Sequence, residues 1–120
     1  MKIKDLGLSA LLPILVSGIV SAADISATIK ECNDCHGNNG VSQWTDVPTI
    51  AGMPAIVHED ALFIYRDNER PAAASPYRQG DTARPPVTMC AVVADLSDED
   101  IVKIAAHYEA KPFVAAKQDF

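Results

Sequence analysis

The feature that most constrains this chain is the motif Cys32-Asn33-Asp34-Cys35-His36. Two residues separate the cysteines, so both sulfur atoms can reach the two vinyl groups on one edge of a porphyrin. The histidine that follows is carried to one face of the ring, where its imidazole can bind the iron. The motif therefore predicts covalent attachment of haem c through Cys32 and Cys35, with His36 as the proximal iron ligand.

The three cysteines of the chain also allow other uses, which fit less well. A thioredoxin-like dithiol belongs to a βαβ pattern that the sequence does not show. A structural zinc site needs four ligands, usually with a second pair of Cys or His residues. The third cysteine, Cys90, directly follows Met89. We interpret Cys90 as a small buried apolar residue, with a disulfide between two chains as the alternative.

Residues 1–22 have the pattern of a secretory signal peptide. Two lysines precede a mainly apolar run over residues 6–20, and small residues follow up to Ala22. An uncleaved membrane anchor is the alternative, but a spanning helix needs about 20 apolar residues. This run is shorter and contains Pro13. We expect cleavage, export to the periplasm, and a single monohaem cytochrome c domain over residues 23–120.

Charge and apolar content limit what the exported part can do. The chain has 10 Lys and Arg residues against 16 Asp and Glu residues, for a net charge of −6. This balance argues against nucleic-acid binding, because phosphate groups need a basic surface. Only 20 Leu, Ile, Val and Phe residues follow residue 22, which is few for a packed core. We expect a haem to supply the missing apolar bulk, and the single attachment motif predicts one haem.

Apolar periodicity predicts three main helices, long loops and no sheet, which together suit a small all-α cytochrome closed around one covalent haem. The helices are expected over residues 24–31, over residues 54–68, and from a cap at Ser97 to a stop at Pro112. Residues 71–88 contain four prolines and are expected to form a long loop. The apolar faces of the second and third helices are expected at Val57, Ala61, Ile64, Tyr65, Ile101, Ile104, Ala105 and Tyr108.

The second iron ligand has four candidates, Met53, Met89, His58 and His107. Met89 is favoured because it ends the long loop, which lets the chain pass around the ring and return on the side opposite His36. A thioether also raises the reduction potential relative to a second imidazole, which suits an electron carrier. We interpret Met53 as core filler, His58 as a surface residue beside acidic neighbours, and His107 as a cation near a helix C-terminus.

Four further residues near the loops are candidates for hydrogen bonds to the haem propionates. A buried carboxylate needs a partner, and Trp, Tyr and Arg side chains can all donate to it. The candidates are Trp44, Tyr77, Arg78 and Arg84, and the alternative is that they are ordinary surface residues.

A series of segments resembles the haem subunit of flavocytochrome c sulfide dehydrogenase, which is similar to other class I cytochromes c. The haem motif and the spacing from Met89 to Ser97 are shared by many cytochromes, whereas IAGMP at 50–54 and PFV at 112–114 point to the sulfide enzyme. The segments are CNDCHG at 32–37, GVS at 40–42, PTIAGMP at 48–54, YR at 65–66, Met89, LSDEDI at 96–101, Ala105, Tyr108 and PFV at 112–114.

The resemblance implies a class I cytochrome c fold, a periplasmic location and a non-catalytic electron-transfer subunit. Its donor would be an FAD-containing flavoprotein that oxidises sulfide, and its acceptor another electron carrier. The resemblance also implies that Met89 is the axial methionine and that the Pro48 carbonyl accepts the remaining N–H of the His36 imidazole. Many such subunits hold two haems in two similar halves, whereas this chain has one attachment motif.

The expected partner surface lies at the haem edge, with the loop 71–87 and the tail 112–120. Phe113 and Phe120 would be its apolar anchors. The sequence also allows two other functions. The first is a free-standing monohaem shuttle of a respiratory or photosynthetic chain. The second is a haem enzyme or gas sensor, which needs an open iron site and is disfavoured by Met89.

Overall fold

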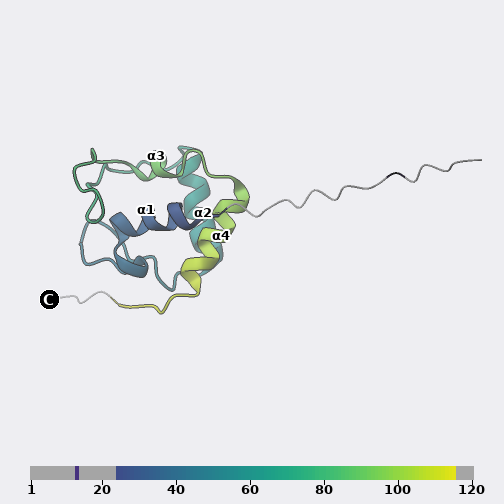
Figure 1. Ribbon diagram of the computed structural model, residues 1–120, viewed down its shortest axis with the longest axis horizontal. Coiled ribbons are helices and arrows are strands. Elements are labelled where there is room, and N and C mark those ends of the chain that lie inside the picture. The colour runs from purple at the N-terminus through teal and green to yellow at the C-terminus, as the bar shows by residue number, and fades with distance from the viewer. Residues whose placement is uncertain (1–12, 14–23, 116–120) are drawn as a thin grey trace, which may run out of the picture.

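The computed structural model describes residues 13 and 24–115. The expected signal peptide, apart from Pro13, lies outside the described residues, and so does the end of the tail from residue 116, including Phe120. None of the described helices is long and apolar enough to cross a membrane. The elements in chain order are α1 (Ser26–His36), the 3₁₀ turn η1 (Asn38–Gly40), α2 (Ala55–Arg66), α3 (Met89–Val93) and α4 (Asp98–Glu109) (Figure 1).

The described chain is all-α, as its periodicity predicted, and a small apolar core joins its helices. α2 packs against both α4 and α3, and Figure 1 shows α3 on one side of α1 and η1 at its end. The predicted apolar face of α4 is confirmed, because all four of its residues are buried. Ile25, the N-cap of α1, and Ile29 within it pack against this core. The core residues are Ile50, Leu62, Val93, Ile101, Ile104 and Tyr108.

The start of α4 follows from its sequence. Ser97 is the N-cap, and its Oγ accepts a hydrogen bond of 3.1 Å from the Asp100 backbone N–H. The Asp100 carboxylate in turn accepts one of 3.3 Å from the Ser97 N–H, which completes a capping box. Three acidic residues in the first turn also lie at the positive end of the helix dipole. The predicted cap is therefore confirmed.

α1 is longer than the helix expected over residues 24–31. It continues through the whole attachment motif to His36. Asn33 and Asp34 have low helix propensity and suggest a loop, but tertiary partners hold them in the helix. The Asn33 Oδ1 accepts a hydrogen bond of 2.8 Å from the Tyr108 hydroxyl, and the Asp34 carboxylate binds the side chain of Arg84.

The buried face of α2 differs from the predicted one. Val57 and Ile64 are 51% and 37% exposed, whereas His58 and Leu62 are each only 4% exposed. The helix is therefore turned by about one residue relative to the expected stripe. The reason is an aromatic contact with α4, because the ring centroid of His58 lies 5.6 Å from that of Tyr108.

The short helix α3 was not predicted, because five residues are too few for a periodic pattern. A local signal does exist at its start. The Thr88 side chain caps the helix by accepting a hydrogen bond of 3.2 Å from the Ala91 N–H. α3 follows directly on the long loop, whose ends are joined by an isolated β-bridge between Ser75 and Val87.

Gly40 allows α4 to approach the loop that follows α1. Its φ is +77°, and a Cβ atom there would lie 2.7 Å from the ring of Tyr108. A side chain at this position would therefore be both strained and sterically blocked. The Gly40 carbonyl also accepts hydrogen bonds from the N–H groups of Ile50 and Ala51, which fixes the segment that carries Pro48.

Candidate haem site

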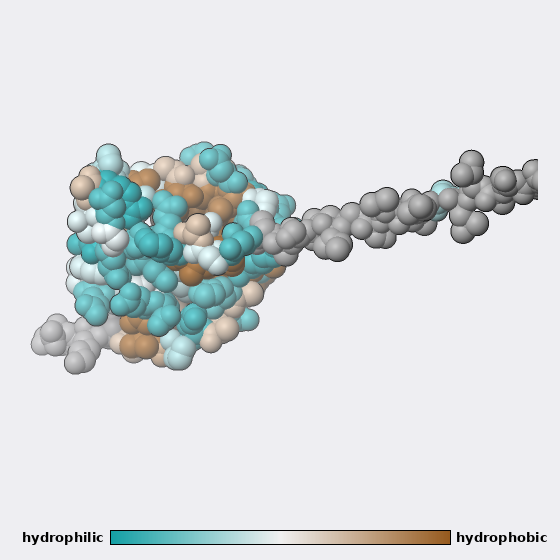
Figure 2. Space-filling view, in the orientation of Figure 1, coloured by the Kyte–Doolittle hydropathy of each residue, from teal (hydrophilic) through white to brown (hydrophobic). Residues whose placement is uncertain are grey.

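A cavity of about 490 Å³ opens between α1, α2, α3 and the loops beside them. Figure 2 shows hydrophobic residues between α1 and α3, ringed by hydrophilic ones. Cys32, Cys35, His36 and Met89 all line this cavity. Its volume is within the range usual for small-molecule and cofactor sites. The structure thus brings together residues that are far apart in the sequence.

The attachment residues share one face of α1. Cys32, Cys35 and His36 are spaced three and four residues apart, which places them side by side on a helix. Burial is the main factor that raises the pKa of the Cys32 thiol to about 11, and it raises the pKa of Cys35 as well. In the chain without haem, both groups are therefore neutral thiols at pH 7.

The orientation of His36 is fixed by a backbone atom. Its Nδ1 lies 2.7 Å from the carbonyl oxygen of Pro48. A carbonyl can only accept a hydrogen bond, so Nδ1 carries the proton and Nε2 keeps its lone pair. Burial lowers the pKa of His36, while the hydrogen bond to Pro48 acts in the opposite direction. The neutral imidazole with an available Nε2 is the form that binds a metal.

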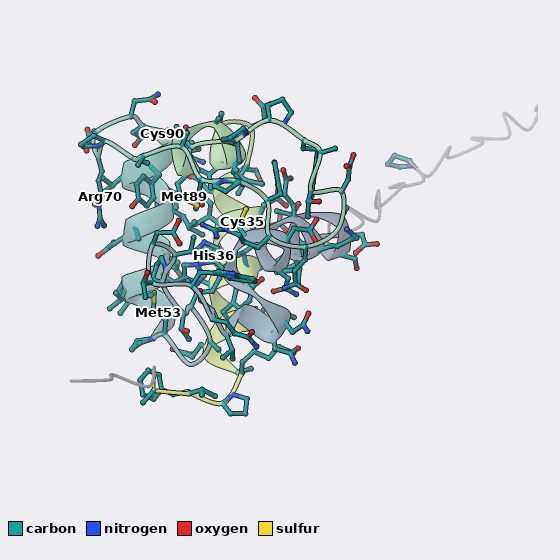
Figure 3. The ribbon with its side chains drawn as sticks, turned by 90° about the vertical axis from the view of Figure 1, so that its left-hand side faces the viewer. Cys35, His36, Met53, Arg70, Met89 and Cys90 are labelled. Atoms are coloured by element: carbon teal, nitrogen blue, oxygen red, sulfur yellow. The ribbon has the colours of Figure 1, made fainter. Side chains whose placement is uncertain are left out.

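Met89 and Met53 occupy different parts of the cavity wall. Met89 is the first residue of α3, so its backbone is held by the Thr88 cap and by packing of α3 on α2. Met53 lies just before α2 and, like Met89, both lines the cavity and packs against the core. Figure 3 shows Met89 above His36 and Met53 below it. Met89 and His36 thus offer a thioether and an imidazole to the same cavity from separate elements.

His58 is a buried residue of the cavity wall, and its assignment to the surface was wrong. Its Nδ1 has no hydrogen-bond partner among the described residues. Burial above all, together with the neighbouring His36, lowers the pKa of His58 to about 4. His58 is therefore a neutral packing residue near pH 7. The other candidate, His107, packs edge-on against Tyr108 and does not line the cavity.

The carboxylate of Asp34, which lies between the two cysteines, ties the long loop to α1. It is within 2.7 Å of Arg84 Nη2 and 3.2 Å of Lys30 Nζ. The Asp34 backbone carbonyl also accepts hydrogen bonds of 2.8 Å and 3.0 Å from the N–H groups of Arg78 and Gln79. We call the side-chain contacts of Asp34 with Lys30 and Arg84 the Asp34 latch.

None of the four expected propionate partners lines the cavity. The guanidinium of Arg84 lies over the ring of Tyr77, 3.5 Å from its centroid, and that of Arg78 lies over Trp44 and pairs with Asp46. The Tyr77 hydroxyl donates to Glu31 over 2.9 Å. These side chains therefore hold the loops against α1 and against one another.

Sequence reasoning did not single out the polar wall residues Arg70 and Ser75, and it interpreted His58, a candidate iron ligand, as a surface residue. Only His58 carried a usable signal, because it precedes Leu62 by one helical turn. Cys90 lies outside the wall, is half-buried, and has its Sγ 3.4 Å from the Arg70 carbonyl oxygen.

The wall as a whole suits a haem. It is largely apolar, and it presents two thiols on one side together with an imidazole and a thioether that can bind iron. The His36 imidazole is already oriented by a hydrogen bond to its second nitrogen, as is usual for metal-binding histidines. The chemistry of the donor set and the shape of the cavity therefore agree.

Comparison with known proteins also points to a haem protein. Residues 22–108 match the cytochrome c family. The chain is also 32% identical over 83 residues to cytochrome c-554(548) of Halomonas halodenitrificans, a match that covers 69% of this chain and 87% of that protein. The chain therefore belongs to the cytochrome c family, and its all-α fold is that of a class I electron-transfer protein with covalently bound haem c.

Proposed function

We propose that this chain is a periplasmic monohaem electron carrier. Cys32 and Cys35 would hold the haem covalently, and His36 and Met89 would bind its iron. The observation that supports this proposal is that these four side chains, from two distant segments of sequence, line one apolar cavity. Export rests on the sequence pattern of residues 1–22.

The haem would supply a one-electron couple between ferric and ferrous iron. His36 and Met89 would both be kept in place in either oxidation state of the iron. Pro48 would hold the His36 ring through its carbonyl, and α3 would hold Met89 through the Thr88 cap. Methionine rather than a second histidine would favour a higher reduction potential. An apolar wall would keep water from the iron.

The electron donor that we propose is the FAD subunit of a sulfide dehydrogenase. This proposal comes from the resemblance carried by residues 50–54 and 112–114. In the structure these two segments touch, because a Cβ atom on Gly52 would lie only 2.7 Å from the Cβ of Phe113. The Phe113 side chain is itself 73% exposed. It is therefore positioned to serve as an apolar anchor for a partner.

A free-standing electron shuttle is the second candidate. It is favoured by the similarity to cytochrome c-554(548), most of whose length this chain matches. In this case the net charge of −6 would guide encounters with basic partners, and no stable complex would form.

Reduction kinetics with the purified holoprotein distinguish the two candidates. Sulfide alone should reduce the cytochrome slowly, and a trace of the FAD sulfide dehydrogenase subunit should accelerate this many-fold. The Phe113→Ser variant should lose most of the acceleration, while Val102→Ser, which changes an exposed valine on α4, should keep it. If the flavoprotein has no effect and does not co-elute with the cytochrome, the free-standing shuttle replaces the first candidate.

A further inference from the structure

Besides His58 Nδ1, two polar groups on the cavity wall have no partner within the described part of the chain. Arg70 is the only Lys or Arg among the residues that line the cavity, and it forms no ion pair there. Its guanidinium lies over the Tyr65 ring, 5.1 Å from the centroid. The Ser75 hydroxyl is buried and makes no hydrogen bond. A buried donor without an acceptor costs free energy, so the Ser75 hydroxyl indicates a missing acceptor. Arg70 is exposed and supplies a positive charge on the same wall.

The acidic groups of the same wall show which sign of charge is missing. Glu31 and Asp46 both line the cavity, and both already have partners. Glu31 accepts a hydrogen bond from Tyr77, and Asp46 pairs with Arg78. The carboxylates are therefore satisfied, whereas the cation of Arg70 and the hydroxyl of Ser75 are not. An anionic ligand would satisfy both.

The position of Arg70 agrees with the chemistry of haem. The vinyl groups and the two propionates lie on opposite halves of the porphyrin, so cysteines that bind the vinyl groups direct the propionates to the far side of the cavity. In Figure 3, Arg70 and Cys35 lie on opposite sides, with His36 and Met89 between them. Ser75 belongs to the segment after Arg70, and its backbone is held to Val87 by hydrogen bonds of 2.9 Å and 3.0 Å.

We propose that Arg70 and Ser75 form the binding site for the haem propionates. Arg70 supplies the positive charge, and the Ser75 hydroxyl donates a hydrogen bond to a carboxylate oxygen. This proposal rests on haem attachment through Cys32 and Cys35. The expected propionate partners Arg78 and Arg84 of the long loop are engaged with Asp46 and Asp34. Arg70, which follows α2, takes this role instead.

The midpoint potential of the holoprotein, measured as a function of pH, tests this site. Arg70→Leu should lower the potential, because removal of a nearby positive charge favours ferric haem. It should also add a pH-dependent step in the neutral range, because a propionate that loses its cation has a higher pKa. Arg70→Lys should restore most of the original behaviour. Ser75→Ala should shift the potential in the same direction by a smaller amount.

Arg66 provides a matched control on α2. Its guanidinium also lies over an aromatic ring, 5.0 Å from the centroid of Phe63, but it pairs with Asp98 and does not line the cavity. Arg66→Leu changes the net charge equally and should give no pH-dependent step.

Three results would overturn the propionate site. These are equal effects of the Arg66 and Arg70 variants, an unchanged potential in Arg70→Leu, or a pH-dependent step in Arg84→Leu instead. Haem staining of each variant on a denaturing gel provides a separate check. Loss of covalent haem from the unmodified protein would instead contradict the proposed function.

Discussion

Pro48 shows how one backbone atom sets the chemistry of a ligand. Because its carbonyl oxygen accepts from His36 Nδ1, the proton is confined to that nitrogen and Nε2 is left for a metal. The attachment residues were predictable because they lie within one stretch of five residues. Arg70 and Ser75 were not, because their place on the cavity wall depends on how the long loop returns after α2.

Replacement of each methionine tests the distal ligand. The oxidised protein should show the weak near-infrared absorption band of methionine-bound ferric haem, and Met89→Ala should abolish this band and lower the reduction potential. Met53→Ala is the matched control, since Met53 also lines the cavity. It should keep the band. The opposite pattern would make Met53 the ligand.

At the scale of elements, the helices that carry their own signals were predicted, and those set by tertiary contacts were not. α4 has a cap at Ser97 and a regular apolar stripe, and the sequence predicted both of them correctly. The end of α1 and the rotation of α2 depend on contacts with Tyr108, which lies far along the chain. Local propensity cannot report such contacts, because their effect comes from packing.

Removal of the Ser97 cap measures how much this local interaction contributes to the stability of the fold. Ser97→Ala should lower the free energy of unfolding by about 1 kcal/mol, because the Asp100 N–H loses its acceptor. Ser26→Ala is the control. Ser26 is an exposed serine in the first turn of α1 and does not act as an N-cap. Urea titrations that give equal changes for the two variants would contradict a specific role for the cap.

The Asp34 latch makes the attachment of the long loop sensitive to acid. Burial acts to raise the pKa of Asp34, but the hydrogen bonds and charges of Arg84 and Lys30 outweigh it and hold this pKa below its ordinary value. Because the pKa of Asp34 is lower in the folded than in the unfolded chain, the Asp34 latch stabilises the fold fully above about pH 5. This stabilisation is lost as the pH falls below about 3.9, the ordinary value for Asp, and through the folded-state pKa.

Asp34→Asn should therefore cost about 1–3 kcal/mol of unfolding free energy at pH 7, and the difference from the unmodified protein should shrink below about pH 4. The matched control is Glu99→Gln, which breaks the pair of the exposed Glu99 with the half-buried Lys103 on α4. That change should cost less than about 1 kcal/mol. Denaturant titrations of the holoproteins at several pH values provide the measurement. A difference that does not change with pH would exclude the latch as its source.

At the scale of the whole molecule, the cavity is large for so small a domain. Water that enters the open cavity meets a largely apolar wall, and a closed, empty void of about 490 Å³ would cost on the order of 12 kcal/mol at about 24 cal/mol per Å³. This is comparable to the entire stability of a typical domain, about 5–15 kcal/mol. The few apolar residues of the sequence predicted this dependence on a bound group, although they could not predict where the cavity lies.

A chain that cannot attach haem should therefore fail to fold cooperatively. The double variant Cys32→Ala/Cys35→Ala should lose most of its helical circular dichroism and its sharp thermal transition. Cys90→Ala, which changes a cysteine outside the cavity wall, should keep both. A double variant with native-like helix content and a sharp transition would show that the protein core is sufficient by itself.

The burial of Cys32 also sets an order of events during biogenesis. In the closed fold this sulfur is shielded, and burial above all raises the pKa of its thiol to about 11, so almost no thiolate forms at neutral pH. A thioether bond requires the sulfur to meet a vinyl carbon, and this is far easier before the helices close. We therefore expect ligation of haem to precede folding, so that any catalyst of ligation acts on an open polypeptide.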